Sequence, residues 1–380
     1  MRRFIMAGLA LLTMSPAFAD EQLLYHFSSH AAFPPGDLVL DDSGNLYGVT
    51  QLDGANGLGT VFRYSPNGQY TVLHDFGGGS DGADPAAGLI RDADGNLYGT
   101  TVSGGLTNQG TVFKIASDGT ESVLYTFKGG SDGANPSGRL TRDRHGNLYG
   151  TTLTGGNTDE RGNTLGTVFK LAPDGREKVI YAFNDSPDAR TPRAGVIRDA
   201  HGNLYGTTSG GGAAGWGAVY KITPDGHESV LASMPDVPFS IPMGELVADG
   251  AGNLYGTTTN STGTIFKVTP EGVLSTLVVF RDNHKQGQVP VSTLLIDSGG
   301  NLFGTAMNGG HNEKGDGEGC GSVFKITPLG KMQTLYLFTG GGSDGCMPVG
   351  GLAPDGHGDF FGTTFFGYHG DVGTIFKVSQ

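Results

Sequence analysis

The sequence predicts an all-β fold, a seven-bladed β-propeller with four antiparallel strands in each blade, on three observations. A stretch close to "GNLYGTT" occurs seven times, at intervals of 48 to 58 residues, beginning at Gly44, Gly95, Gly146, Gly202, Gly252, Gly300 and Gly358. Further short apolar runs follow each copy in a fixed order, and no segment has the spacing of apolar residues that marks a helix. A period near 50 residues built from such runs is typical of propellers and not of helical repeat proteins.

Each unit contains four β-rich runs of five to seven residues, separated by Gly, Asp, Asn and Pro. In the second unit these runs lie around Leu89, Tyr98, Phe113 and Leu124. By analogy with other propellers, we expect the run around Leu89 to line the axis. Seven such units correspond to seven four-stranded blades.

The two ends of the chain are out of phase with the repeat. A strand-like run, "LLYHF" at Leu23 to Phe27, precedes the first unit, and the last unit stops after its third run at Gly373 to Val378. The seventh blade therefore lacks its own outer strand. We expect the N-terminal strand to supply it, so that the ring has no open edge.

The unit resembles the GloVer-type (choice-of-anchor) tandem repeat of bacterial surface and secreted proteins, and more distantly the NHL and senescence-marker lactonase propellers. The resemblance rests on "GNLYGTT", "GTVFKI" and "SVLYTF" recurring in this order over residues 20–380. It implies a propeller with an extracytoplasmic location and no settled activity.

Residues 1–19 have the features of a cleavable signal peptide, namely Arg2 and Arg3, an apolar run from Phe4 to Leu12, and small residues up to Ala19. We expect cleavage near Ala19, a single propeller domain over residues 20–380, and a secreted or periplasmic protein. The apolar run is shorter than the roughly 20 residues of a membrane helix, so no membrane insertion is expected.

The chain is acidic, with 24 Lys and Arg against 37 Asp and Glu and a formal net charge of -13. An acidic surface repels nucleic acid, which we exclude as a partner. We expect a monomer that binds a carbohydrate or a protein.

Residues present in all seven units are expected to serve the blade, so a functional site should lie where the units differ. The Asp four residues before each "NLYG", such as Asp92, is interpreted as a turn residue. The run "DADGN" at Asp92 also resembles half a calcium loop but lacks the Glu at the twelfth position. The "GGSDG" loops at Gly78, Gly129 and Gly341 each offer one carboxylate and are interpreted as turns. No metal site is therefore assigned, and calcium is the one cofactor left open.

Long loops are expected on one face of the ring, which is the candidate binding face. Cys320 and Cys346 both lie there and are expected to form a disulfide. Four histidines on this face lack metal-ligand spacing; they are His30, His284, His311 and His369.

One position, just before the first apolar residue of each inner strand, differs between units near the mouth of the axial channel. Four of its seven residues are polar: Asp37, Arg139, Glu245 and Thr293. Asp37 and Glu245 are candidates for an acid and base pair, with Arg139 binding an anionic group of a substrate. The alternative is a solvated funnel in which Arg139 balances the two acids.

Aromatic residues on the candidate face suit the apolar faces of sugars. Trp216 and Tyr368, together with Phe365 and Phe366, are candidates for stacking on sugar rings, and packing between blades is the alternative. We include Thr293 with Trp216 and Tyr368 as ligand-binding candidates.

Three functions remain open from the sequence. The first is a binding or interaction module for a carbohydrate or protein ligand on the long-loop face. The second is an enzyme, such as a polysaccharide lyase, glycosidase or lactonase, that uses Asp37, Glu245 and Arg139 in the axial pocket. The third is a structural envelope protein.

Overall fold

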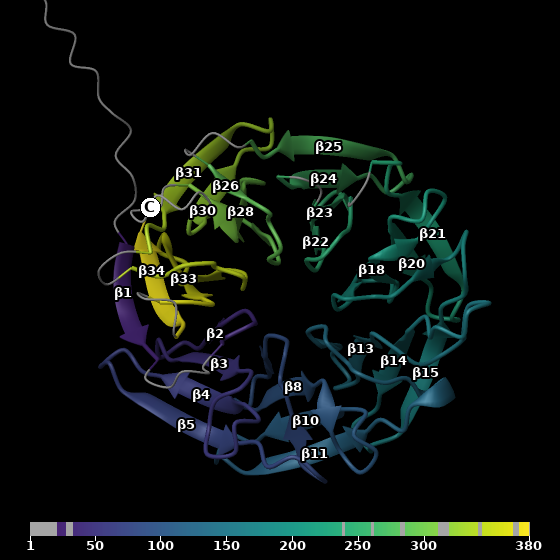
Figure 1. The fold of residues 1–380 in the computed structure, drawn as a ribbon, viewed down its shortest axis with the longest axis horizontal. Coiled ribbons are helices and arrows are strands. Elements are labelled where there is room, and N and C mark those ends of the chain that lie inside the picture. Colours follow the sequence, from purple (N-terminus) through teal and green to yellow (C-terminus); the bar gives the residue numbers. More distant parts are fainter. Residues whose placement is uncertain are drawn as a thin grey trace, which may run out of the picture.

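The computed structural model describes residues 21–27, 33–237, 240–259, 262–281, 286–310, 319–340, 344–367 and 372–379. In this part of the chain, seven four-stranded antiparallel sheets surround a central axis (Figure 1). The predicted seven-bladed propeller is therefore confirmed. The expected signal peptide lies outside the described residues.

The strands run from the axis outward in chain order in six blades, and in the seventh the outermost strand is β1, from the start of the described chain. Blade by blade they are β2 (Val39–Leu40), β3 (Leu46–Thr50), β4 (Thr60–Tyr64) and β5 (Tyr70–Asp75); β7 (Ile90–Arg91), β8 (Leu97–Thr101), β10 (Thr111–Ile115) and β11 (Glu121–Thr126); β12 (Thr141–Arg142), β13 (Leu148–Thr152), β14 (Thr167–Leu171) and β15 (Glu177–Ala182); β17 (Ile197–Arg198), β18 (Leu204–Thr208), β20 (Ala218–Ile222) and β21 (Glu228–Ser233); β22 (Val247–Ala248), β23 (Leu254–Thr258), β24 (Thr264–Val268) and β25 (Leu274–Val279); β27 (Leu295–Ile296), β28 (Leu302–Ala306), β30 (Ser322–Ile326) and β31 (Met332–Leu337); β32 (Ala353–Pro354), β33 (Asp359–Thr364), β34 (Thr374–Ser379) and β1 (Glu21–His26).

The ring is closed by its two ends, as the sequence predicts. Strand β1 pairs antiparallel with β34, with Glu21 opposite Val378 and His26 opposite Thr374. Phe27, which follows β1, is 1% exposed, and its ring centroid lies 5.5 Å from that of Phe62 in blade 1. The first described strand is thus held by the last blade and also packs against the first.

The repeated "GNLYGTT" serves the blade in two ways. In blade 2, Asp92 accepts the backbone N–H groups of Asp94 and Asn96 at 3.1 and 2.9 Å and the Tyr98 hydroxyl at 2.9 Å, which confirms its interpretation as a turn residue. Gly99 leaves room for an aromatic ring of the neighbouring strand, because a Cβ there would lie 2.5 Å from Phe113. The same close approach of a ring recurs in all seven blades.

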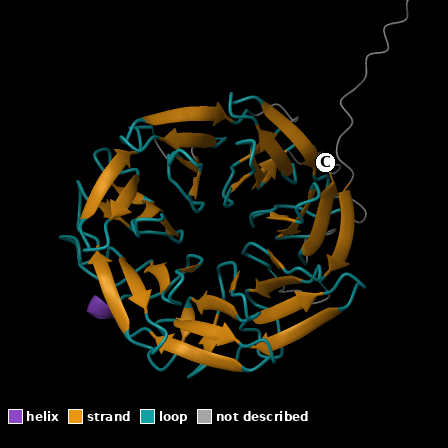
Figure 2. Ribbon diagram, turned by 180° about the vertical axis from the view of Figure 1, so that it is seen from behind, coloured by secondary structure: helices purple, strands orange, loops and turns teal. Residues whose placement is uncertain are grey.

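The connections between the second and third strands of a blade and those between blades share one face, which we call the long-loop face. Short ladders tie these loops together, namely β6 (Gly82–Ala83) with β9 (Ser103–Gly104), β16 (Ala189–Arg190) with β19 (Gly210–Gly211), and β26 (Gly287–Gln288) with β29 (Asn308–Gly309). Figure 2 shows the ring from behind, with the single described helical turn, η1 (Gly130–Asp132), at its rim. Among the described residues, no helix reaches the length and apolar character needed to cross a membrane.

Candidate functional site

Three of the four polar residues that distinguish the units meet in the axial channel. Arg139, from blade 3, places its Nε 3.1 Å from Glu245 Oε2 of blade 5. Its Nη1 lies 3.8 Å from Asp37 Oδ2 of blade 1. One guanidinium therefore joins side chains from three blades that lie around the ring.

These side chains separate two cavities along the axis. The first encloses about 260 Å³ and is lined by residues that precede the inner strands, including Met243 and Val349, so it opens on the long-loop face. We call it the axial cavity. The second encloses about 380 Å³ and is lined by the inner strands themselves. Asp37, Arg139 and Thr293 line both cavities, so the charged group lies between them.

Glu245 is the most buried charged group of the site, with 4% of its surface exposed. Its Oε2 accepts the hydrogen bond from Arg139, while its Oε1 is buried without a hydrogen-bond partner among the described residues. Burial raises the pKa of the Glu245 carboxyl to about 7, with Arg139 opposing the rise and Asp37 adding to it. A carboxyl of this kind changes its charge near neutral pH.

Two glycines of the same position let the polar side chains approach. A Cβ at Gly195 would lie 2.8 Å from Glu245 Oε1 and 2.1 Å from the Arg139 carbonyl oxygen. Asp37 Oδ1 accepts the backbone N–H of Gly351 at 2.5 Å, which links blade 1 to blade 7. The glycines at this position of the repeat thus leave the space that the charged side chains of the site occupy.

Both interpretations of the polar residues Asp37, Arg139 and Glu245, as an acid and base pair or as a charge-balanced funnel, agree with this geometry. Arg139 balances two acids, as in the charge-balanced funnel. The two contacting carboxylate oxygens share one guanidinium, which limits their separation to roughly 9 Å, within the range of paired-carboxylate chemistry. The binding of an anionic substrate group by Arg139 stays a prediction, since both acids already contact its guanidinium.

Of the aromatic candidates, Trp216, Phe365 and Phe366 do not line the axial cavity. Trp216 is half-buried against the core cluster of blades 4 and 5, and its indole N–H donates to Asp236 Oδ1 at 3.3 Å. Phe365 stacks on Phe33 with ring centroids 4.6 Å apart. Tyr368 lies outside the described residues, as do His30, His284, His311 and His369. The roles of Trp216 and Tyr368 in ligand binding stay predictions.

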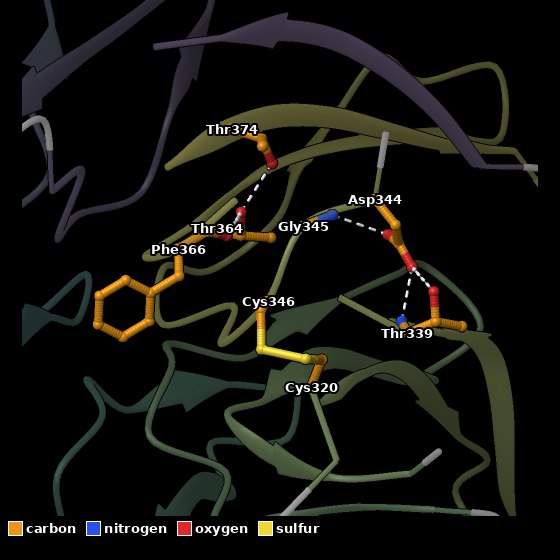
Figure 3. Close-up of a disulfide and its surroundings, with 8 residues drawn as sticks. All are labelled: Cys320, Thr339, Asp344, Gly345, Cys346, Thr364, Phe366 and Thr374. Atoms are coloured by element: carbon orange, nitrogen blue, oxygen red, sulfur yellow. Dashed lines mark hydrogen bonds between the residues drawn. A yellow bond between two sulfur atoms is a disulfide. The ribbon is translucent and has the colours of Figure 1, made fainter. Parts of the chain in front are cut away.

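Cys320 and Cys346 are joined by a disulfide, with Cα atoms 4.4 Å apart and a sequence separation of 26 (Figure 3). Asp344, which lies two residues before Cys346, accepts the Thr339 and Gly345 N–H groups at 2.6 and 2.8 Å. The backbone of Cys346 also forms an isolated antiparallel β-bridge with Phe366 in the last blade. The disulfide thus ties the long-loop face of blade 6 to the loop that leads into blade 7.

Sequence reasoning missed a second set of acids, at the outer rim between blades. A Glu that begins an outer strand faces an Asp from the loop of the preceding blade at four boundaries, as the pairs Asp81 and Glu121, Asp132 and Glu177, Asp188 and Glu228, and Asp344 and Glu21. Burial, followed by the neighbouring Asp, raises the pKa of Glu177 and Glu228 to about 7. In the sequence, this Glu occurs where the loop before its unit carries "GGSD" or a similar run with Asp. That co-occurrence is a signal from which the four pairs could have been predicted.

A comparison with protein families agrees with the repeated units seen in the sequence. The family model of the Gloeobacter/Verrucomicrobia repeat matches residues 10–212 and 192–380. No curated protein sequence matches the chain.

Solved structures with similar folds are distant in sequence. The extracellular domain of a hybrid two-component system from B. thetaiotaomicron is 12% identical, with a TM-score of 0.61, and the match covers 94% of this chain and 39% of that one. A gluconolactonase from Xanthomonas campestris is 18% identical, with a TM-score of 0.45, over 75% of this chain and 85% of that one. The chain thus spans well under half of the first protein, and the likeness to that protein concerns the fold alone.

Proposed function

Because the chain belongs to the Gloeobacter/Verrucomicrobia repeat family, we propose that it is an extracytoplasmic binding module whose axial cavity takes a carbohydrate end, with a protein ligand on the same face as the alternative. The observation that carries this proposal is Glu245, a buried carboxyl whose Oε1 lacks a partner beside a cavity of about 260 Å³. An unsatisfied buried acceptor is costly unless a ligand or water donates to it. A sugar hydroxyl is a donor of suitable size and charge.

The location rests on other observations. A disulfide persists in oxidising compartments and is rare in the cytosol, and Cys320 is joined to Cys346. The signal-like residues 1–19 agree with export. We propose a secreted or periplasmic protein.

The binding proposal is tested with a glycan array probed with the mature protein, beside Glu245→Gln and Asp37→Asn. We expect binding of a defined set of glycans that Glu245→Gln weakens at least tenfold, since the amide offers a donor where the carboxylate accepts. Glu177→Gln is the matched control, because Glu177 also has a pKa of about 7 but lies at the outer rim. Equal binding by Glu245→Gln and wild type would exclude the axial cavity as the site.

A second candidate function is catalysis in the same cavity. It is favoured by Glu245, whose pKa near 7 suits a general acid or base at neutral pH, with the Asp37 carboxylate on the same guanidinium. A panel of polysaccharide lyase, glycosidase and lactonase substrates distinguishes it from binding. Turnover that is lost in both Asp37→Asn and Glu245→Gln while the ligand still binds would favour the enzyme, and no turnover by wild type would remove it.

A further inference from the structure

The boundary between blades 1 and 2 holds a group of three potential metal ligands, away from the axis. His74 lies in β5, Asp81 in the loop that follows, and Glu121 at the start of β11 in the next blade. One ligand atom from each side chain lies within 4.8 Å of the other two. Among the described residues, this is the one group of three or more such side chains that comes together in this way.

The other boundaries of this type provide an internal comparison. Where blade 1 has His74, blades 2, 3 and 6 have a tyrosine beside the same Asp and Glu. The Tyr125 hydroxyl donates to Asp132 at 2.6 Å, and the Tyr181 hydroxyl donates to Asp188 at 2.7 Å. Each tyrosine hydroxyl thus donates a hydrogen bond to the aspartate, whereas a neutral imidazole can offer a lone pair to a cation. The histidine makes the first boundary chemically different from its three relatives.

The distance between His74 and Asp81 at the first boundary fits ligation of one ion. His74 Nε2 lies 3.1 Å from Asp81 Oδ2, which is about the separation of two ligands that each lie roughly 2.1 Å from one ion. The backbone N–H groups of Gly77 and Gly82 donate to the Asp81 carboxylate at 2.7 and 2.8 Å and fix its orientation. Edge-on packing against Phe76, with ring centroids 4.8 Å apart, fixes the His74 ring. Both ligands are therefore oriented before any ion arrives.

Glu121 supplies the third ligand and an unbalanced charge. Its Oε1 is buried and has no hydrogen-bond partner among the described residues. Burial, and then the nearby Asp81, raises the pKa of the Glu121 carboxyl, while His74 lowers it. A cation between the two carboxylates would remove their repulsion. The side chains of His74 and Asp81 are 19% and 23% exposed, so an ion can reach them from solvent.

We propose that His74, Asp81 and Glu121 bind one divalent cation of the zinc class and so tie blade 1 to blade 2 at the outer rim. One imidazole with two carboxylates suits zinc, whereas calcium and magnesium prefer oxygen ligands alone. Water completes the coordination. The inference is independent of the axial cavity, and it goes beyond the sequence, from which no metal site is assigned and calcium is left open.

The test measures zinc bound to the mature chain, purified without a polyhistidine tag, by equilibrium dialysis and by calorimetry. We expect one tight equivalent of Zn²⁺ in wild type and weaker binding of Ca²⁺ and Mg²⁺. His74→Tyr should lose that equivalent, with at least a tenfold fall in affinity, and should still fold because three boundaries already carry tyrosine there. Glu121→Gln should weaken binding in the same way, whereas Glu177→Gln at the next boundary should leave it unchanged.

A gain of function makes the test independent of loss by misfolding. Tyr125→His places the same three ligand types at the boundary of blades 2 and 3 and should raise the stoichiometry to two. Zinc should raise the melting temperature of wild type by about 2 to 5 °C and leave that of His74→Tyr unchanged. Retention of the tight equivalent by His74→Tyr, or no second equivalent in Tyr125→His, would overturn the proposal.

Discussion

Arg139 Nε lies 3.1 Å from Glu245 Oε2 although the two residues precede the inner strands of blades 3 and 5. The Arg139 side chain therefore spans the position of blade 4, where a Cβ at Gly195 would lie 2.8 Å from Glu245 Oε1 and 2.1 Å from the Arg139 carbonyl oxygen. Because Glu245 is buried, this guanidinium is the charge partner on which its ionised form depends.

Arg139→Gln should destabilise the fold in a pH-dependent manner. Removal of one partner of a buried pair costs about 3 kcal/mol when the other stays charged, which we expect at pH 8. At pH 6 the loss should be smaller, because Glu245 can then hold a proton. Urea unfolding at pH 6 and at pH 8 measures the loss of unfolding free energy. Arg176→Gln is the control, since Arg176 is 84% exposed beside Asp174 and should change stability by less than about 1 kcal/mol. An equal loss for Arg139→Gln at both pH values would contradict the role of Glu245.

The protein should be more stable in mild acid than in mild alkali. The pKa of Glu21, Glu177, Glu228 and Glu245 is raised to about 7 from an ordinary value of 4.5. The folded state therefore holds more protons than the unfolded state between these values, so this stability is present in full below about 4.5 and is lost as the pH rises through 7. The turn aspartates act in the opposite sense, because hydrogen bonds lower the pKa of groups such as Asp92 below 3.8.

We accordingly expect the melting temperature at pH 5.5 to exceed that at pH 8, with a fall again in strong acid as the turn aspartates take up protons. Differential scanning calorimetry across this range measures the effect. Glu177→Gln combined with Glu228→Gln should reduce the difference between pH 5.5 and pH 8. A melting temperature that rises from pH 5.5 to pH 8 would show that these carboxyls are ionised in the folded protein.

Loss of the disulfide should destabilise the fold without opening the ring. Closure of a loop with 26 residues of sequence separation contributes about 3.5 kcal/mol in the chain-entropy model. Cys320→Ser with Cys346→Ser should therefore lower the unfolding free energy by up to this amount, measured in guanidinium chloride. Wild type with a reductant should shift to the same midpoint, and reductant should not affect the double variant.

Gly99→Ala should destabilise blade 2 through packing alone. The added Cβ would lie 2.5 Å from the Phe113 ring, and overpacking of this kind costs typically about 1 to 3 kcal/mol. Gly250→Ala is the matched control, because no atom lies within 4 Å of its Cβ position. We expect no loss of stability for Gly250→Ala in the same unfolding assay. Equal effects of the two variants would mean that backbone entropy, and not the ring contact, explains the glycine.

The fold was predictable because the same local sequence pattern occurs seven times. Asp92 with Gly95 marks a turn, and Leu97 to Thr101 marks the strand that follows, as the structure has them. The closure by residues 23–27 was also predictable, since a lone outer strand at one end matched a missing outer strand at the other. Repetition turned weak local signals into a strong one.

The site was predictable only in part. Asp37, Arg139 and Glu245 occupy one position of the repeat, so the ring must bring them to one level of the axis. That Arg139 contacts both acids depends on the channel width and on the small residues between them, such as Gly195, which no single unit encodes. The group of His74, Asp81 and Glu121 was missed because its members come from two units, and each unit alone reads as a strand or a turn.

The pairing of β1 with β34 also sets the order of events in synthesis. Glu21 is synthesised well before Val378, so its strand has no partner until β34 has been made. Until β1 pairs with β34, the first strand has an unpaired edge, and so does the last blade once it forms; another chain can pair with such an edge. Closure of the ring therefore acts as a check on completeness, because a chain that stops short of its final strand cannot hide those edges.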